Sequence, residues 1–236
     1  MKFKIRISHY GFTLTELLVA MGISGIVMAS TYSVYHSHQK TYVAQEQVVA
    51  MQQNLRVAMY YMEREIRMAG YDPTQSGAAG IVTADGNSIR VTSDIHDGVD
   101  NDGDGTADED DEVGNADGVI DPANGNEDIT YSLSDNDGDG DNDLERNGNL
   151  IAENIDALNF AYLDESGTVL ATPVASLEDI RSVQITLVAR TGRRDPGYTN
   201  TTAYANQQGT EILPAQNDSF RRRHLRAQVK CRNLGL

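Results

Sequence analysis

The first pattern along the chain is an apolar run close to its N-terminus. It reads FTLTELLVAMGISGIVMA from Phe12 to Ala29, and a short stretch with Lys2, Lys4 and Arg6 precedes it. As a helix this run would measure about 27 Å, close to the roughly 30 Å hydrocarbon layer of a membrane. Positive charge before the run orients the N-terminus towards the cytoplasm. The simplest alternative is an uncleaved membrane anchor.

The helical pattern continues well beyond the length that a membrane requires. Apolar residues recur at spacings of three and four, which places them on one stripe of a helix. The members of this stripe are Val48, Met51, Leu55, Ala58, Met62, Ile66 and Ala69. A glycine and an Asp-Pro pair then supply a stop signal. We therefore predict a helix over residues 12–69, with a transmembrane part over 12–32 and an amphipathic stalk over 33–69.

The pattern after residue 70 changes to the alternation that is typical of strands. The predicted strands lie within residues 80–93, where an Asp-Gly-Asn sequence predicts a hairpin, and within 128–133, 157–170, 182–190 and 225–232. Cys231 falls in the apolar register of the last strand, which predicts a core position. Antiparallel strands with one apolar face fit a sheet laid on the C-terminal part of the helix. The expected fold class is α+β, with residues 70–236 forming a β-rich globular domain.

Charge changes this picture at one insert, residues 94–145. The chain carries a formal net charge of −16 with 35 Asp and Glu residues. Twenty of these acids and no Lys or Arg lie in the insert, which leaves the rest of the chain slightly basic. Without counter-ions such a segment would repel itself and stay expanded.

The insert contains the sequence DNDGDG twice, at residues 100–105 and 135–140. Each copy extends to D-x-D-x-D-G-x-x-D, the first half of a calcium loop, in which alternate carboxylates converge on one ion. The candidate ligands are Asp100, Asp102, Asp104, Asp108 and Asp111 in the first loop, and Asp135, Asp137, Asp139 and Asp143 in the second. We predict that Ca²⁺ orders this insert.

Two alternatives to an ordinary calcium loop remain for the insert. No helical pattern flanks either aspartate loop, so an EF-hand is not expected, and the repeats are similar to the helix-free aspartate repeats of thrombospondin type 3 modules. The other interpretation is a solvated, disordered acidic loop, which composition alone would support.

The start of the apolar run carries a more specific signal. Residues 11–16, GFTLTE, followed by the apolar run, resemble the class III signal of type IV prepilins and type II secretion pseudopilins. The resemblance implies a leader peptide over residues 1–11, cleavage after Gly11 by a prepilin peptidase and N-methylation of Phe12. It also implies that Glu16 meets the amino terminus of a neighbouring subunit. A buried carboxylate and a buried ammonium each cost several kcal/mol alone and become tolerable as a pair, so Glu16 would set the packing register.

The order of the later segments resembles PilW-type minor pilins and the related J-type minor pseudopilins. The segments that carry this likeness are residues 60–73, 146–169, 179–190 and 221–233. The resemblance implies a minor pilin that helps to initiate or cap a pilus with major and other minor pilins. It would span the inner membrane once before assembly and reach the cell surface afterwards. A minor pseudopilin of type II secretion and a calcium-dependent tip adhesin remain alternatives.

Motifs for catalysis or nucleic-acid binding are missing from the sequence. None of the five His residues has zinc-site spacing, and there is no nucleophile elbow or phosphate loop, so an enzyme is not expected. The basic run Arg221–Arg226 lacks an aromatic platform, so no nucleic acid is expected as a partner. Such a run at a strand is more often solvated or paired with the protein's own acids.

Overall fold

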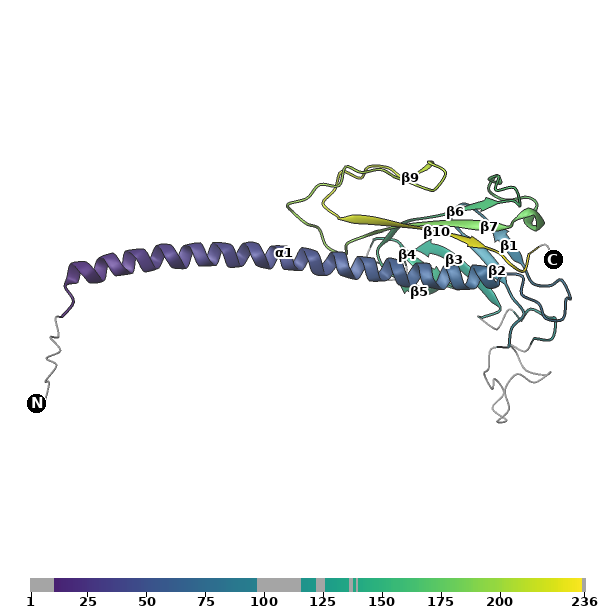
Figure 1. Cartoon of the computed structure of the whole chain (residues 1–236), viewed down its shortest axis with the longest axis horizontal. Helices are drawn as coiled ribbons and strands as arrows, with labels where there is room; N and C mark the ends of the chain where they lie inside the picture. Colours follow the sequence, from purple (N-terminus) through teal and green to yellow (C-terminus); the bar gives the residue numbers. More distant parts are fainter. Residues whose placement is uncertain (1–10, 97–115, 122–125, 136–137, 139, 235–236) are drawn as a thin grey trace, which may run out of the picture. The chain divides into compact units, whose positions relative to one another are not determined.

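The structure is a computed structural model that describes residues 11–96, 116–121, 126–135, 138 and 140–234 (Figure 1). It contains two compact units, a first unit (Met1–Glu46) and a globular unit (Gln47–Leu236). Residues 1–10 of the leader and the whole first aspartate loop lie outside the described residues, and so do Asp137 and Asp139 of the second loop.

A single helix, α1 (Leu14–Met68), passes through both units and confirms the predicted helix to within two residues at each end. The helix stops because Gly70 adopts a positive φ of 78°, a conformation that residues with a Cβ rarely adopt. The N–H of Gly70 donates to the carbonyl of Thr92 at 3.0 Å. A Cβ atom here would lie 2.6 Å from the Leu234 side chain, so the close approach also favours glycine.

The apolar stripe of α1 forms one wall of the core in the globular unit. Six of its seven predicted members are buried, and Val48 is half-buried against them. Met62 and Ile66 have no exposed surface at all. Burying side chains of this size stabilises the fold by about 1.5–3 kcal/mol each, which is why the stripe keeps its spacing.

Antiparallel sheets form the rest of the described globular unit. The five-stranded sheet has the order β1 (Ile81–Ala84), β2 (Ile89–Thr92), β3 (Asp128–Ser134), β4 (Asp143–Arg146), β5 (Asn149–Ala152). The three-stranded sheet has the order β10 (Arg222–Lys230), β7 (Ser182–Arg190), β6 (Ile155–Leu163). A small ladder joins β8 (Tyr204–Ala205) to β9 (Glu211–Leu213), and a 3₁₀ turn, η1, covers Leu177–Asp179.

The core lies where α1 and both larger sheets meet. Phe160 on β6 and Ile185 and Leu187 on β7 belong to the same buried cluster as the helix stripe. Cys231 also belongs to it and is 2% exposed, as the alternation predicted. Glu65 fixes the helix to the five-stranded sheet, because its carboxylate accepts the hydroxyl of the buried Tyr131 and pairs with Arg146 at 3.0 Å.

The three-stranded sheet differs from the sequence prediction, which expected one face on a core. β7 is buried on both faces over almost its whole length. The reason is the segment between β7 and β10, which passes along the side of this sheet away from α1 (Figure 1). Tyr204 packs there against Val188, and Gln208 donates to Gln184 at 2.7 Å. Polar residues of β7 are therefore covered by hydrogen-bonded chain and not by water.

Candidate functional sites

The N-terminus of α1 carries a reciprocal cap built by Thr13 and Glu16. The N–H and the hydroxyl of Thr13 each lie 2.9 Å from the Glu16 carboxylate, and the N–H of Glu16 donates to the Thr13 hydroxyl at 3.3 Å. This is a capping box, in which two residues three positions apart satisfy each other's free backbone donors. Sequence reasoning assigned Glu16 to a partner subunit and missed this local partner, although the signature T-x-x-E was present.

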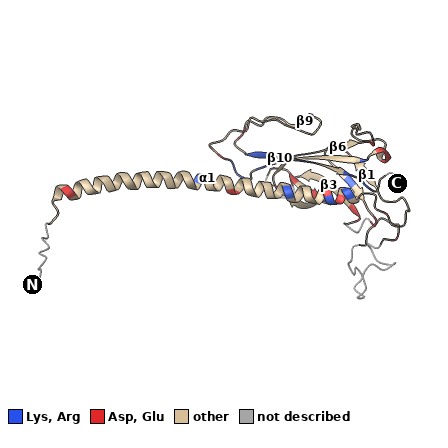
Figure 2. Cartoon of the chain, in the orientation of Figure 1, with Lys and Arg blue, Asp and Glu red and all other residues tan. Residues whose placement is uncertain are grey.

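The first unit presents an apolar helix surface without cover from its own chain. Every residue from 11 to 43 is exposed, including Phe12 at 89%. Between residues 12 and 39 the only charged side chain is Glu16, so Figure 2 colours this part of α1 tan apart from one red segment near its start. In length and hydropathy α1 could cross a membrane. A surface of this kind marks contact with lipid or with another protein.

The second aspartate loop is described at two of its four predicted ligands. Asp135 is exposed, and its carboxylate accepts the N–H groups of Gly138 at 2.9 Å and Gly140 at 3.2 Å. Asp143 begins β4, is 1% exposed and accepts the N–H of Asn154 at 3.0 Å. In the described part of the chain, no three His, Cys, Asp or Glu side chains are gathered as a metal site.

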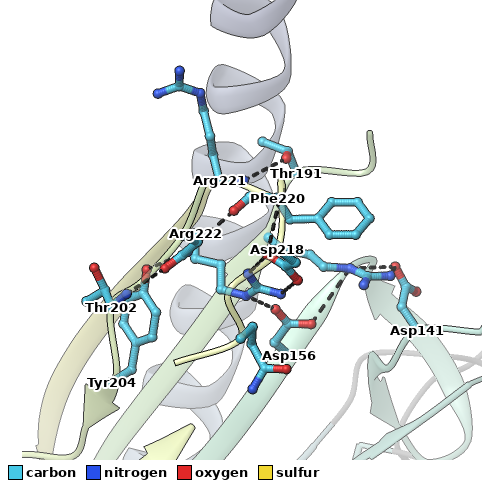
Figure 3. A network of polar contacts seen from close by, with 12 residues as sticks. Asp141, Asp156, Thr191, Thr202, Tyr204, Asp218, Phe220, Arg221 and Arg222 are labelled. Carbon is cyan, nitrogen blue, oxygen red and sulfur yellow. Dashed lines mark hydrogen bonds and ion pairs between the residues drawn. The ribbon is translucent and has the colours of Figure 1, made fainter. Parts of the chain in front are cut away.

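A cluster of arginines and aspartates joins β10 to its neighbours in the globular unit (Figure 3). The Arg222 guanidinium is 2% exposed, pairs with Asp156, and binds Asp218 through two nitrogens at 2.5 and 2.7 Å. Arg190 pairs with Asp141 at 2.5 Å and lies 3.7 Å from Asp156. A buried arginine of this kind tolerates burial because its donors are occupied.

The arginine cluster also holds the covering segment in place. The Arg190 guanidinium stacks over the Phe220 ring at 4.4 Å, and Arg221 donates to Asp195 at 2.9 Å. Hydrogen bonds from Arg222 hold the pKa of Asp218 below its usual value, and Arg221 does the same for Asp195. Arg221 and Arg222 of the basic run thus pair with the protein's own acids, while Arg223 and Arg226 are exposed, so both outcomes expected from the sequence occur. The role of the paired arginines in the described structure is to pin residues 192–220 onto the sheet.

Comparison with known proteins gives a match at the N-terminus. The family described as the prokaryotic N-terminal methylation motif matches residues 7–32, a range that includes Gly11, Phe12 and Glu16. No curated protein matches the chain significantly. Among solved structures, a type IV-like pilin from Thermus thermophilus is similar, with 15% identity and a TM-score of 0.42 over 78% of this chain and 98% of that chain.

The matched motif implies processing by a prepilin peptidase. Together with the apolar helix, it is consistent with a chain that enters the inner membrane first and a pilus afterwards. The description of the matched motif names no catalytic activity. The chain therefore carries the prokaryotic N-terminal methylation motif at the start of a long apolar helix.

Proposed function

We propose that the chain is a minor type IV pilin that helps to initiate or cap a pilus. A prepilin peptidase would cut after Gly11, and Phe12 would become the methylated first residue. The observation that carries the proposal is the contrast between a globular unit with its own core and a helix start whose apolar residues are all exposed. This N-terminal part of α1 is suited to lie in the inner membrane before assembly and then to pack against other pilins in the pilus.

The maturation step can be tested on surface fibres by mass spectrometry of the N-terminal peptide. The expected peptide begins with methylated Phe12 and continues with Thr13 and Leu14. A mature chain that begins at Met1 would contradict the proposal and leave a tethered surface protein.

The role proposed for Glu16 is to pair with the amino group of a neighbouring subunit during packing. The capping box makes a sharp test possible, because Gln can also occupy the N3 position of the box but carries no charge. We expect Glu16→Ala and Glu16→Gln both to insert into the membrane normally and both to be strongly depleted from sheared fibres. The measurement is an immunoblot of membrane and fibre fractions.

The Glu16→Gln variant decides between two roles of this side chain. Normal incorporation of Glu16→Gln together with loss of Glu16→Ala would show that Glu16 acts through the helix cap alone. Thr13→Ala is the matched control, since it weakens the cap by about 0.5–2 kcal/mol and keeps the carboxylate. If all three variants enter fibres as the parent does, the charge-pairing role is wrong.

We also propose that the two aspartate loops bind Ca²⁺, because both repeat the same ligand spacing. Asp135 supports this in part, since its carboxylate accepts the N–H groups of Gly138 and Gly140 within the predicted loop. A calcium-ordered insert on a minor subunit would suit a tip adhesin, which is one alternative function.

The other alternative function is a minor pseudopilin of type II secretion. Crosslinking in the native cell tests it, since recovery of the chain with secretion pseudopilins and not with pilins would assign the chain to type II secretion.

A further inference from the structure

Two fully buried carboxylates lie where the acidic insert leaves and rejoins the five-stranded sheet. Asp94 follows β2 and Glu127 precedes β3, and both are 0% exposed. The N–H of Ser93 donates to the carbonyl of Glu127 at 2.9 Å, so the two chain ends lie side by side. We call this place the neck of the insert. Acidic side chains are almost never fully buried unless a partner compensates them.

Each neck carboxylate is only half satisfied. Asp94 accepts the N–H of Gly118 through Oδ2 at 2.9 Å. Glu127 accepts the N–H of Asp121 through Oε2 at 2.8 Å, and the backbone N–H of Ile95 also donates to this carboxylate. The other two oxygens, Oδ1 of Asp94 and Oε1 of Glu127, are buried and have no hydrogen-bond partner in the described part of the chain. Buried oxygens of this kind require a proton, a water or an ion.

Negative charges around the neck increase the need for a proton or a cation at these buried oxygens. Burial raises the pKa of both the Asp94 and the Glu127 carboxyl. The negative charges of Asp72 and Asp117 raise the pKa of Asp94 further, and those of Asp94 and Asp121 raise that of Glu127. The positive charge that acts against this at Asp94 comes from His96. No Lys or Arg occurs anywhere in residues 94–145. The neck therefore concentrates negative charge with little compensation from its own segment.

Backbone contacts hold the neck in place from several sides. The N–H of Asp94 donates to the carbonyl of Tyr71 at 2.8 Å, directly after the end of α1. Ser76 donates to the carbonyl of Gly118 at 2.8 Å, and a Cβ on Gly118 would lie 2.4 Å from the Thr74 hydroxyl. The loop after α1 and the described middle of the insert thus close around Asp94. Asp94 is thus held in a fixed position, as a preorganised ligand requires.

We propose that Asp94 and Glu127 bind a divalent cation with the chemistry of Ca²⁺ at the neck. Two carboxylates match the charge of the ion, and the two buried oxygens supply its first ligands. Ca²⁺ takes about six to eight oxygens and accepts backbone carbonyls and water among them, so it does not need a third acidic side chain in place beforehand. The ion would close the base of the insert. This site is separate from both aspartate loops and does not rest on the proposed pilus function.

The test uses the full chain in detergent, in a background where the loops cannot bind. Asp100, Asp102, Asp104, Asp135, Asp137 and Asp139 are replaced by Asn in this background. Its Tm is measured in chelator and in millimolar Ca²⁺, and we expect a rise with Ca²⁺. Adding Asp94→Asn with Glu127→Gln should abolish this rise. In chelator the same pair should melt at or above the background, because two repelling buried charges are removed.

A matched control and a direct measurement complete the test. Glu165→Gln changes an exposed acid of the globular unit and should leave the calcium response unchanged. Calorimetric titration should give one Ca²⁺ per background chain, and Asp94→Asn or Glu127→Gln alone should weaken binding about tenfold or more, a difference of about 1.4 kcal/mol. A background that binds no Ca²⁺, or a response that survives the Asp94 and Glu127 changes, would overturn the proposal. A Tm that responds to acid and not to Ca²⁺ would assign a proton to the neck instead.

Discussion

The two parts of α1 are both rich in apolar residues, yet only one of them has a partner in its own chain. Ile23, in the first unit, is 58% exposed, whereas Ile66, in the globular unit, has no exposed surface. The second part packs on two sheets and forms one core with them. Apolar periodicity therefore predicts the helix in both parts but does not say what covers it.

The difference between the two parts indicates that the cover of the first unit must come from outside the chain. Large apolar side chains of the first unit are exposed from Phe12 to Val43. Monomeric soluble proteins rarely leave so much contiguous apolar surface in contact with water. In the proposed function, membrane lipid covers this surface before assembly and other pilin subunits cover it in the pilus. Three experiments would sharpen or break this comparison.

The largest effect is expected from one substitution made in both parts of the helix. Ile66→Ala should reduce the free energy of unfolding of the globular unit by about 2–5 kcal/mol, because it opens a cavity in the core. Ile23→Ala should leave that free energy unchanged, since its side chain contacts no core. Urea denaturation of the full chain in detergent measures both. Equal losses in the two variants would mean that the first unit also contributes to the core.

A smaller effect is expected from a charge placed in the first unit. Ile26→Lys should oppose membrane insertion by about 2.5–3.5 kcal/mol, because a lysine near the centre of a spanning helix is poorly solvated by lipid. Val57→Lys is the control, as Val57 is 45% exposed on the part of α1 that belongs to the globular unit. Membrane fractionation measures insertion. Full insertion of Ile26→Lys would count against a lipid-covered first unit.

The smallest effect is expected from acid, acting on the globular unit. The pKa of Asp218 is lowered by its hydrogen bonds to Arg222, and that of Asp195 by Arg221. Each lowered pKa contributes stability that is present above the unfolded value of about 3.9 and is lost as pH falls through the folded value. Unfolding free energies at pH 7 and pH 3 measure this loss.

The acid experiment needs a background without the neck carboxyls. Their raised pKa values have the opposite sign, so protonating them adds stability as pH falls. Asp94→Asn with Glu127→Gln removes that contribution. In this background Asp218→Asn should lose less stability on acidification than the parent. An equal loss would show that the Arg222 pair does not contribute to the pH dependence.

Much of the fold could be predicted because its elements are long and regular. The stripe of α1, the first hairpin and the long strands β6, β7 and β10 all follow from periodicity. The strands β4, β5, β8 and β9 were not predicted, because runs of two to four residues carry little pattern of their own. The equally short β1 and β2 were predicted only because an Asp-Gly-Asn turn joins them. The burial of both faces of β7 was missed for another reason. Its cover comes from an irregular segment held by side-chain contacts.

The candidate sites were predictable to different degrees. The motif at residues 11–16 is local, so the sequence alone indicated it, and the match over residues 7–32 supports it. The arginine run suggested pairing with the protein's own acids but could not say which ones. Nothing in the sequence distinguishes Asp94 and Glu127 from the other acids of the insert. They are brought together only when β2 and β3 pair.

The capping box at the start of α1 has a consequence for how a fibre could grow and shrink. Thr13 already gives the Glu16 carboxylate hydrogen bonds within one subunit. The amine of a neighbouring subunit would therefore replace hydrogen bonds that Glu16 already makes, and would not meet a carboxylate without partners. Such an exchange lowers the free energy gained when each subunit joins the fibre, so unassembled subunits would be stable in the membrane. Polymerisation would then stay easy to reverse.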